Sequence, residues 1–241
     1  MIKAHNAPLG QVSIPPLALV PGKRSGVHRR SRSFCKGTAG NVQRCALHSQ
    51  IMITGWRVCG YLWLTFFVLW MVAALFTKRS AVRISWQRGL RYGIPVVLGY
   101  YLMFSLKIDM PWLQRRLFPR SESLDISAIV ITIAGMLFAG WARIYLGRNW
   151  SSAPMIRERH ELIRSGPYRL VRHPIYTGIL LAMVGTFLAN GKVRGLLAVL
   201  LVWLGWTIKS RMEEEFMVQS FGDQYEEYRR RTGALLPKFH S

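Results

Sequence analysis

An uncharged apolar run, "VCGYLWLTFFVLWMVAALF" from Val58 to Phe76, sets the strongest limit on how this chain can fold. A helix needs about 20 such residues to cross the hydrocarbon core of a bilayer. Trp56 and Arg57 precede the run, and Lys78 and Arg79 follow it. Aromatic and basic residues at both ends are typical of the boundary between membrane and water. We therefore expect at least one helix to cross a membrane.

The composition agrees with this once it is sorted by position. The chain carries a net charge of +22, yet 51% of its residues are hydrophobic. The apolar residues fall in blocks and Lys and Arg fall between them, which is the pattern of an integral membrane protein with basic loops. Because the charge is spread over every loop, it favours contact with anionic lipid surfaces, and we expect no nucleic-acid partner.

Further apolar segments predict an all-α fold, an integral membrane bundle of about five transmembrane helices. The spans are placed near residues 58–76, 89–106, 126–145, 174–189 and 195–212. Pro95 lies near the start of the second span, where proline costs least, and Ser123 or Asp125 can cap the third. The last two are short for a crossing and are separated by "NGKVRG", which predicts a helical hairpin.

The sequence after the last span still reads as a helix. In "KSRMEEEFMVQSFG", Lys209 and Glu213 form one i,i+4 pair of opposite charge, and Arg211 and Glu215 form another. We expect this helix to leave the membrane, to carry its acidic residues into water and to break at Gly222. A helical C-terminal region on the cytoplasmic side would follow.

Residues 1–51 differ from the rest of the chain. They contain no acidic residue, are rich in Pro, Gly and Ser, and show no lasting helical or strand periodicity. We predict that they are disordered. They are either a basic leader or the product of a misassigned start, with Met52 as the true first residue. Residues 52–241 are then the membrane domain.

The predicted hairpin also fixes which loops share a face. It brings the 143–174 loop and the C-terminal tail to the same side, and both are basic, so we expect both in the cytoplasm. The loop at 107–124 fits this orientation less well, because Arg115, Arg116 and Arg120 would lie on the opposite side.

Two groups of polar residues flank the predicted hairpin, one before its first helix and one after the apolar part of its second helix. The first is "GPYRLVRHPIYTG", residues 166–178, in which Pro174 suits a first helical turn and puts His173 near the N-cap. The second is the acidic run Glu213–Glu215. Residue types alone allow two interpretations: the first group is an interfacial anchor and the second a solvated charged face, or together they bind a ligand.

Several common sites are missing from the sequence. It has no GxxxxGK[ST], HExxH or GxSxG motif and no strand-borne GxGxxG. His160 and His173 have no cysteine nearby, and Cys35, Cys45 and Cys59 show no metal-ligand spacing. We therefore expect no metal site.

The ordered combination of motifs is more specific than any single one. "SGPYRLVRHPIYTG", the hairpin, an "EE" pair seven residues before "FG", and then "Y", "Y" and "LLP" together resemble the isoprenylcysteine carboxyl methyltransferase family. The resemblance runs from about Leu146 to Pro237. Members of that family are integral membrane enzymes that use S-adenosylmethionine, and they methylate the carboxylate of a prenylated cysteine. The resemblance implies the same cofactor here.

The resemblance also implies roles for particular residues. His173, Tyr176, Gly178 and the pair Glu213 and Glu214 would hold S-adenosylmethionine. A basic residue just before the pair would face the acceptor carboxylate. That residue is Arg211, or else Lys209, and Arg172 is a further candidate for acceptor binding. Arg211 and Glu214 would be the catalytic residues.

The chemistry implied is simple. A carboxylate is ionised at neutral pH and needs no general base, so alignment and exclusion of water can supply most of the rate. The acceptor would be a prenylated or similar lipidic acid, and membrane lipids would surround the protein. The small number of spans suggests a bacterial inner (cytoplasmic) membrane protein with its site facing the cytoplasm. The oligomeric state is left open.

Three alternatives remain. The first is N-methylation of a phospholipid amine, which would need a base or a depressed amine pKa and could use Glu215. The second is a membrane sterol reductase, a class that resembles this family in its C-terminal half but has about twice as many spans. The third is a non-catalytic membrane protein whose basic loops bind anionic lipid.

Overall fold

The computed structural model describes residues 39–75, 85–105, 107–147 and 162–238, with side chains described from Gly55 onward. Residues 1–38 of the predicted leader lie outside this part. The chain divides into two compact units, Met1–Cys45 and Ala46–Ser241, and the second is the subject below. Its elements are α1 (Ala39–Leu75, which begins in the first unit), α2 (Trp86–Phe104), α3 (Pro111–Gln114), α4 (Glu122–Leu146), the 3₁₀ turn η2 (Gly166–Arg169), α5 (Pro174–Asn190), α6 (Val193–Phe221) and α7 (Asp223–Arg231).

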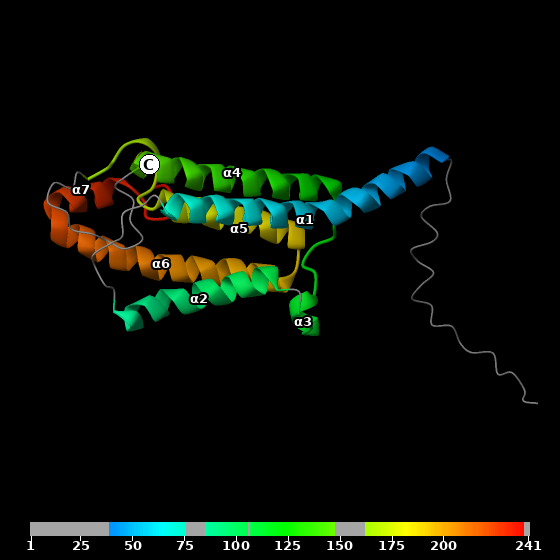
Figure 1. The fold of residues 1–241 in the computed structure, drawn as a ribbon, viewed down its shortest axis with the longest axis horizontal. Coiled ribbons are helices and arrows are strands. Elements are labelled where there is room, and N and C mark those ends of the chain that lie inside the picture. Colours follow the sequence, from blue (N-terminus) through cyan, green and yellow to red (C-terminus); the bar gives the residue numbers. More distant parts are fainter. Residues whose placement is uncertain (1–38, 76–84, 106, 148–161, 239–241) are drawn as a thin grey trace, which may run out of the picture. The chain divides into compact units, whose positions relative to one another are not determined.

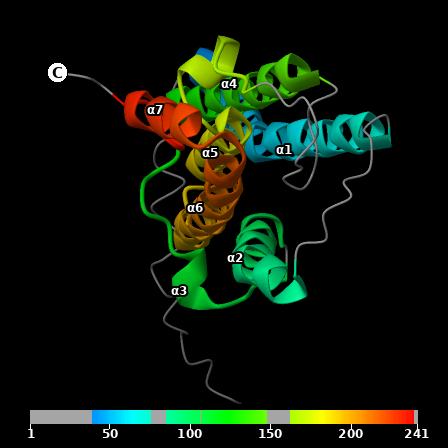
Figure 2. The same ribbon diagram turned by 90° about the vertical axis from the view of Figure 1, so that its left-hand side faces the viewer.

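The long helices α4, α5, α6 and α2 lie side by side in that order (Figures 1 and 2). Small residues allow the close contacts. A Cβ atom added at Gly178 of α5 would lie 2.6 Å from the backbone nitrogen of Ala139 in α4. A Cβ atom added at Gly205 of α6 would lie 2.9 Å from the backbone oxygen of Tyr92 in α2. Both pairs are therefore held at backbone contact, which fixes how their ends are positioned.

Helix α1 packs against three of these helices through Cys59 and Trp63. The indole N–H of Trp63 donates to the hydroxyl of Thr186 in α5 at 2.8 Å, and its ring makes a T-shaped contact with the ring of Tyr100 in α2. Cys59 contacts Thr132 of α4 at 3.6 Å. The central core is made of buried apolar residues: Trp63, Met103, Ala139, Ile179, Ala182, Met183, Ala198 and Val202.

The predicted fold class is confirmed: the part of the chain described here is helical, with no strand beyond two isolated bridges. Three helical segments are long and apolar enough to cross a membrane, namely Gly55–Leu75, Glu122–Leu146 and Val193–Phe221. Helix α5 is a shorter apolar helix. Helices α5 and α6 form the predicted hairpin, because α6 begins three residues after α5 ends and the two helices pack together.

Some local predictions were wrong. Helix α1 begins at Ala39, so residues 39–51 are helical and not disordered; no proline follows Pro21 before the apolar run, so nothing forces a later start. Pro95 lies inside α2, since that helix already begins at Trp86. The cap of α4 is Ser121, whose hydroxyl accepts from the backbone N–H of Leu124 at 3.3 Å.

The predicted extension of the last helix is confirmed. Helix α6 runs to Phe221, well past the apolar segment. It ends at Gly222, whose φ of 53° lies in the left-handed region that glycine adopts at little cost. Helix α7 follows directly and folds back toward the start of α5 (Figure 1).

Candidate active site

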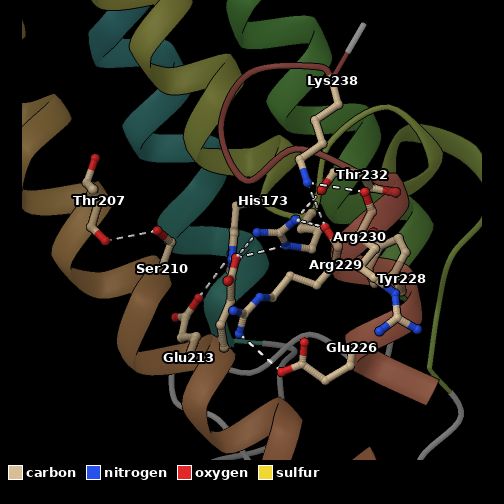
Figure 3. A network of polar contacts seen from close by, with 12 residues as sticks. His173, Thr207, Ser210, Glu213, Glu226, Tyr228, Arg229, Arg230, Thr232 and Lys238 are labelled. Atoms are coloured by element: carbon tan, nitrogen blue, oxygen red, sulfur yellow. Dashed lines mark hydrogen bonds and ion pairs between the residues drawn. The ribbon is translucent and has the colours of Figure 1, made fainter. Parts of the chain in front are cut away.

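The site lies where α5 begins and α6 emerges from its apolar segment. His173 is the N-cap residue of α5, with Pro174 as the first residue of the helix. The hairpin runs antiparallel, so the start of α5 faces the distal part of α6 that carries Glu213 and Glu214. Figure 3 shows His173 pointing toward Glu213 across this gap. The two polar groups singled out in the sequence are therefore brought together.

His173 bridges the two carboxylates. Its Nδ1 atom lies 3.4 Å from Glu213 Oε2, and its Nε2 atom lies 3.2 Å from Glu214 Oε1. An ionised carboxylate only accepts hydrogen bonds. His173 can therefore donate a hydrogen bond to both glutamates only if both of its ring nitrogens carry a proton. Burial lowers the pKa of His173, but hydrogen bonds and charges from Glu213 and Glu214 outweigh this and raise the pKa above its usual value. The geometry therefore favours an imidazolium.

Arg172 is the second cation on this pair. Its Nε and Nη2 atoms lie 2.9 and 2.8 Å from Glu214 Oε1, and its side chain is 8% exposed. Its Nη1 atom donates to the backbone carbonyls of Arg229, at 3.1 Å, and Thr232. Sequence reasoning proposed Arg172 as an acceptor-binding residue. The structure places it between Glu214 and the C-terminal segment, and its role toward an acceptor stays a prediction.

That segment, residues 223–238, forms one side of the site. The backbone N–H groups of Arg172 and His173 donate to the carbonyls of Gly233 and Ala234, at 2.8 and 3.1 Å. The Tyr228 hydroxyl donates to the carbonyl of Tyr168 at 2.5 Å. Burial raises the pKa of Tyr228 to about 12, so this hydroxyl remains a donor at neutral pH. The segment therefore fixes the backbone on which His173 stands.

Aromatic rings form another side. The Tyr176 hydroxyl donates to Glu213 Oε1 at 2.7 Å. Its ring is parallel to that of His173, at 5.5 Å between centroids, and to that of Trp206, at 4.6 Å. The ammonium of Lys209 lies 5.3 to 5.5 Å from the ring centroids of Tyr92, Tyr176 and Trp206. A cation therefore lies in an aromatic box beside a carboxylate.

Lys209 belongs to this site, whereas Arg211 is exposed on the same helix. The predicted pair between Lys209 and Glu213 is present at 3.8 Å. Arg211 and Glu215 are both exposed, and the described part of the chain shows no ion pair between them. That predicted pair was wrong, because two long exposed side chains gain little from pairing in water.

Gly178 lies one helical turn deeper, buried at the contact of α5 with α4. Its contacts are those of close helix packing, and its predicted contact with a cofactor remains a prediction. Sequence reasoning missed Tyr92 and Trp206, because aromatic residues near a membrane boundary are usually anchors. In the residues that the structure covers, no group of three His, Cys, Asp or Glu side chains could hold a metal ion.

These contacts define what the site can do. Two largely buried carboxylates lie beside aromatic rings, and cations from two parts of the chain contact them: Arg172 and His173 just before α5, and Lys209 on α6. Such an arrangement can bind hydroxyl groups and a positive charge on a ligand, and Lys209 can bind a negative group.

Comparison with known proteins gives a consistent result. The family model for phospholipid methyltransferase matches residues 125–224. A probable protein-S-isoprenylcysteine O-methyltransferase from Oryza sativa subsp. indica is 31% identical over 145 residues, which cover 57% of this chain and 75% of the relative. Protein-S-isoprenylcysteine O-methyltransferase B of Arabidopsis thaliana is 33% identical over 45% of this chain and 57% of its own length.

Two other similar proteins are a relative with a different kind of name and a solved structure. The cobalt-zinc-cadmium resistance protein CzcN of Cupriavidus metallidurans is 33% identical over 49% of this chain and 54% of its own length. A solved structure of a eukaryotic intramembrane Ras methyltransferase is 19% identical, with a TM-score of 0.40, over 65% of this chain and 54% of that one.

Proposed function

This chain belongs to the isoprenylcysteine carboxyl methyltransferase family, and from that premise we propose that it moves a methyl group from S-adenosylmethionine to the carboxylate of a lipidic acid. An isoprenylated cysteine is the acceptor in the names of its relatives. The observation that carries the proposal is the bridge of His173 to Glu213 and Glu214, which joins the two motifs of the family in one site.

The residues present fit S-adenosylmethionine. When bound, that cofactor supplies a methyl group on a sulfonium, which is already a strong electrophile. Glu213 and Glu214 offer carboxylate oxygens to its ammonium and hydroxyl groups. Trp206 is an aromatic ring of the site, which suits a flat base or a sulfonium, and Tyr176 supports it by stacking between Trp206 and His173. His173 and Arg172 would keep both carboxylates ionised and oriented.

Lys209 is the group that we propose for the acceptor carboxylate. Its side chain is 17% exposed and already points into the aromatic box, whereas Arg211 is exposed on α6. An ammonium needs only a small rotation about its flexible stem to leave Glu213 for a second carboxylate. Arg211, predicted from the sequence, remains the alternative for this role, and Arg172 acts by positioning Glu214.

The remaining catalytic work is alignment. A carboxylate acceptor is ionised near neutral pH, so the site needs no base to remove a proton. Its rings and buried carboxylates would exclude water and hold the reacting atoms in line, which can contribute about 7–11 kcal/mol to lowering a barrier. The site stands at the end of apolar helices, where a soluble cofactor and a lipid-bearing acceptor can both arrive.

A second function has one specific observation in its favour. The aromatic box around Lys209 is suited to a cation, and the family model that matches is named for phospholipid methylation. An amine acceptor could displace Lys209 from the three rings. Amine methylation would then need a neutral amine, for which a nearby carboxylate is a candidate base.

We further propose that the site faces the cytoplasm of a bacterial inner membrane. Arg164, Arg169 and Arg172 lie before α5, and Arg229, Arg230 and Arg231 end α7, so the site end is rich in positive charge. Positive loops remain on the cytoplasmic side of the membrane during insertion.

The test begins with the full chain in detergent and S-adenosylhomocysteine titrated by calorimetry. We expect saturable binding, and its absence at millimolar ligand would contradict the whole proposal. A lipid extract is then incubated with the enzyme and methyl-labelled cofactor. A base-labile methyl ester identifies the carboxylate acceptor, whereas a base-stable methylamine identifies the phospholipid amine.

A further inference from the structure

A second group of basic side chains lies at the opposite end of the hairpin, about 25 Å from His173 along α5. It consists of Arg116 in the loop before α4, Lys192 in the hairpin turn and Arg194 in the first turn of α6. The loop and the turn are joined as an isolated antiparallel bridge between Arg116 and Lys192. The backbone N–H of Leu117 donates to the carbonyl of Gly191 at 2.9 Å. Backbone contacts therefore hold the loop with Arg116 against the turn with Lys192, directly before Arg194.

These three side chains donate hydrogen bonds to uncharged oxygen atoms. Arg116 donates to the carbonyls of Asn190, at 3.1 Å, and Phe118, at 3.4 Å. The ammonium of Lys192 donates to the side-chain oxygen of Gln114, and Nη1 of Arg194 donates to the carbonyl of Ser105, each at 2.5 Å. Across residues 55–75, 85–105, 107–147 and 162–238, none of the three forms an ion pair.

Part of this charge is buried. Arg194 is 6% exposed, and its Nε atom has no hydrogen-bond partner in the described structure. The same is true of Nη2 of Arg116. Burial lowers the pKa of Lys192, and so do the charges of Arg194, Arg116 and Arg120. Asp125 acts in the other direction on Arg116, but burial and Arg120 outweigh it and lower the pKa of Arg116. The cluster is therefore positive and incompletely satisfied.

The start of α6 adds further positive charge to this cluster. A helix N-terminus carries partial positive charge and favours anions. The first turn of α6 has no acidic residue, and Lys192 as its N-cap makes no side-chain capping bond. Two of the three cations therefore lie where the helix itself is positive. An anion at this point would interact favourably with the helix end and with Lys192, whose ammonium the charges of Arg194 and Arg116 already reach.

We propose that Arg116, Lys192 and Arg194 form a binding site for a phosphate group, of the kind carried by the headgroup of a membrane phospholipid. Guanidinium groups present paired N–H donors that match phosphate oxygens, and Lys192 adds a point charge. The cluster sits at the ends of two apolar helices, α4 and α6, where headgroups lie. This site also gives a reason for the basic residues of the 107–124 loop, which fit the predicted orientation poorly. Their positive charge would bind a lipid headgroup.

The test measures lipid affinity of the full chain in detergent. Phosphatidylglycerol, phosphatidylcholine and inorganic phosphate are titrated separately, and bound lipid is counted by native mass spectrometry. We expect saturable binding of phosphatidylglycerol, about tenfold weaker in Arg116→Gln and in Lys192→Gln, because each loses a charge-assisted hydrogen bond. Arg116→Lys keeps the charge and separates loss of the site from misfolding. Inorganic phosphate that binds as tightly and competes would assign the same site to a soluble phosphate.

The matched control is Arg115→Gln, which removes an equal charge from an exposed neighbour in the same loop. It should leave lipid affinity within about twofold. Equal losses in Arg115→Gln and Arg116→Gln would overturn the proposal, since binding would then reflect general surface charge. Lipid affinity that is unchanged in Arg116→Gln and Lys192→Gln would overturn it as well.

Discussion

The two ends of the α5–α6 hairpin carry similar basic side chains with opposite kinds of partner. At the site end, Arg172, His173 and Lys209 all contact carboxylates of Glu213 or Glu214. At the turn end, Arg116 and Lys192 contact carbonyl and amide oxygens. The difference teaches that a cation's partners decide what it can do: at one end the cations hold acidic groups in place, and at the other, in our proposal, they bind an anion.

The largest effect is expected at Glu214. Glu214→Ala removes the partner of two cations, and breaking a buried ion pair costs about 3–5 kcal/mol. We expect binding of S-adenosylhomocysteine to be lost in calorimetry, while Glu214→Gln, which keeps an acceptor oxygen for Arg172, retains the fold. Glu215→Ala is the control, because Glu215 is exposed on the same helix. Equal binding by the Glu214→Ala and Glu215→Ala variants would show that the site is elsewhere.

A smaller and more selective effect is expected at Lys209. Lys209→Met keeps the stem in the aromatic box and removes the charge. We expect kcat/KM for a carboxylate acceptor to fall about 100-fold, equivalent to about 2.7 kcal/mol of lost transition-state stabilisation. Cofactor affinity should change by less than about fivefold. Arg211→Met is the matched variant, and the reverse order of effects would return the acceptor role to Arg211.

The sequence indicated the two halves of the site but not all of their partners. The HPxYxG turn and the acidic pair could be found because each stands beside an apolar helix, and a hairpin must bring them together. The contacts of Arg172 with the carbonyls of Arg229 and Thr232 could not be found, because backbone carbonyls leave no signature in residue types. Tyr92 was missed for a related reason: its role depends on how α2 packs against α6.

The third expected effect is a pH dependence at the site end. The folded-state pKa of His173 is raised, so its contribution to stability is fully present below about pH 6.5 and is lost as pH rises through the raised value. Thermal unfolding in detergent should therefore show a melting temperature that declines over this window. His173→Gln should flatten the decline. An unchanged profile in that variant would mean that the ring is neutral in the folded protein.

The smallest effect is expected at the turn end. Lys192→Gln removes a cation that has no carboxylate partner, so we expect the free energy of unfolding in lipid-free detergent to change by less than about 0.5 kcal/mol. Arg172→Gln, at the other end, should lower it by several times as much, because Glu214 loses the guanidinium whose Nε and Nη2 atoms both contact its Oε1 atom. Comparable losses in the two variants would remove the distinction between the two ends.

The pairing of residues 172–173 with residues 233–234 has a consequence for biosynthesis. All of the apolar helices leave the ribosome before the segment that carries Gly233 and Ala234, so insertion into the bilayer precedes completion of the site. A chain interrupted after Phe221 would keep its membrane helices and both glutamates, but Arg172 would have no carbonyls to bind. Such a product would insert into the membrane and remain inactive there. Membrane insertion and formation of the active site are therefore separate steps for this protein.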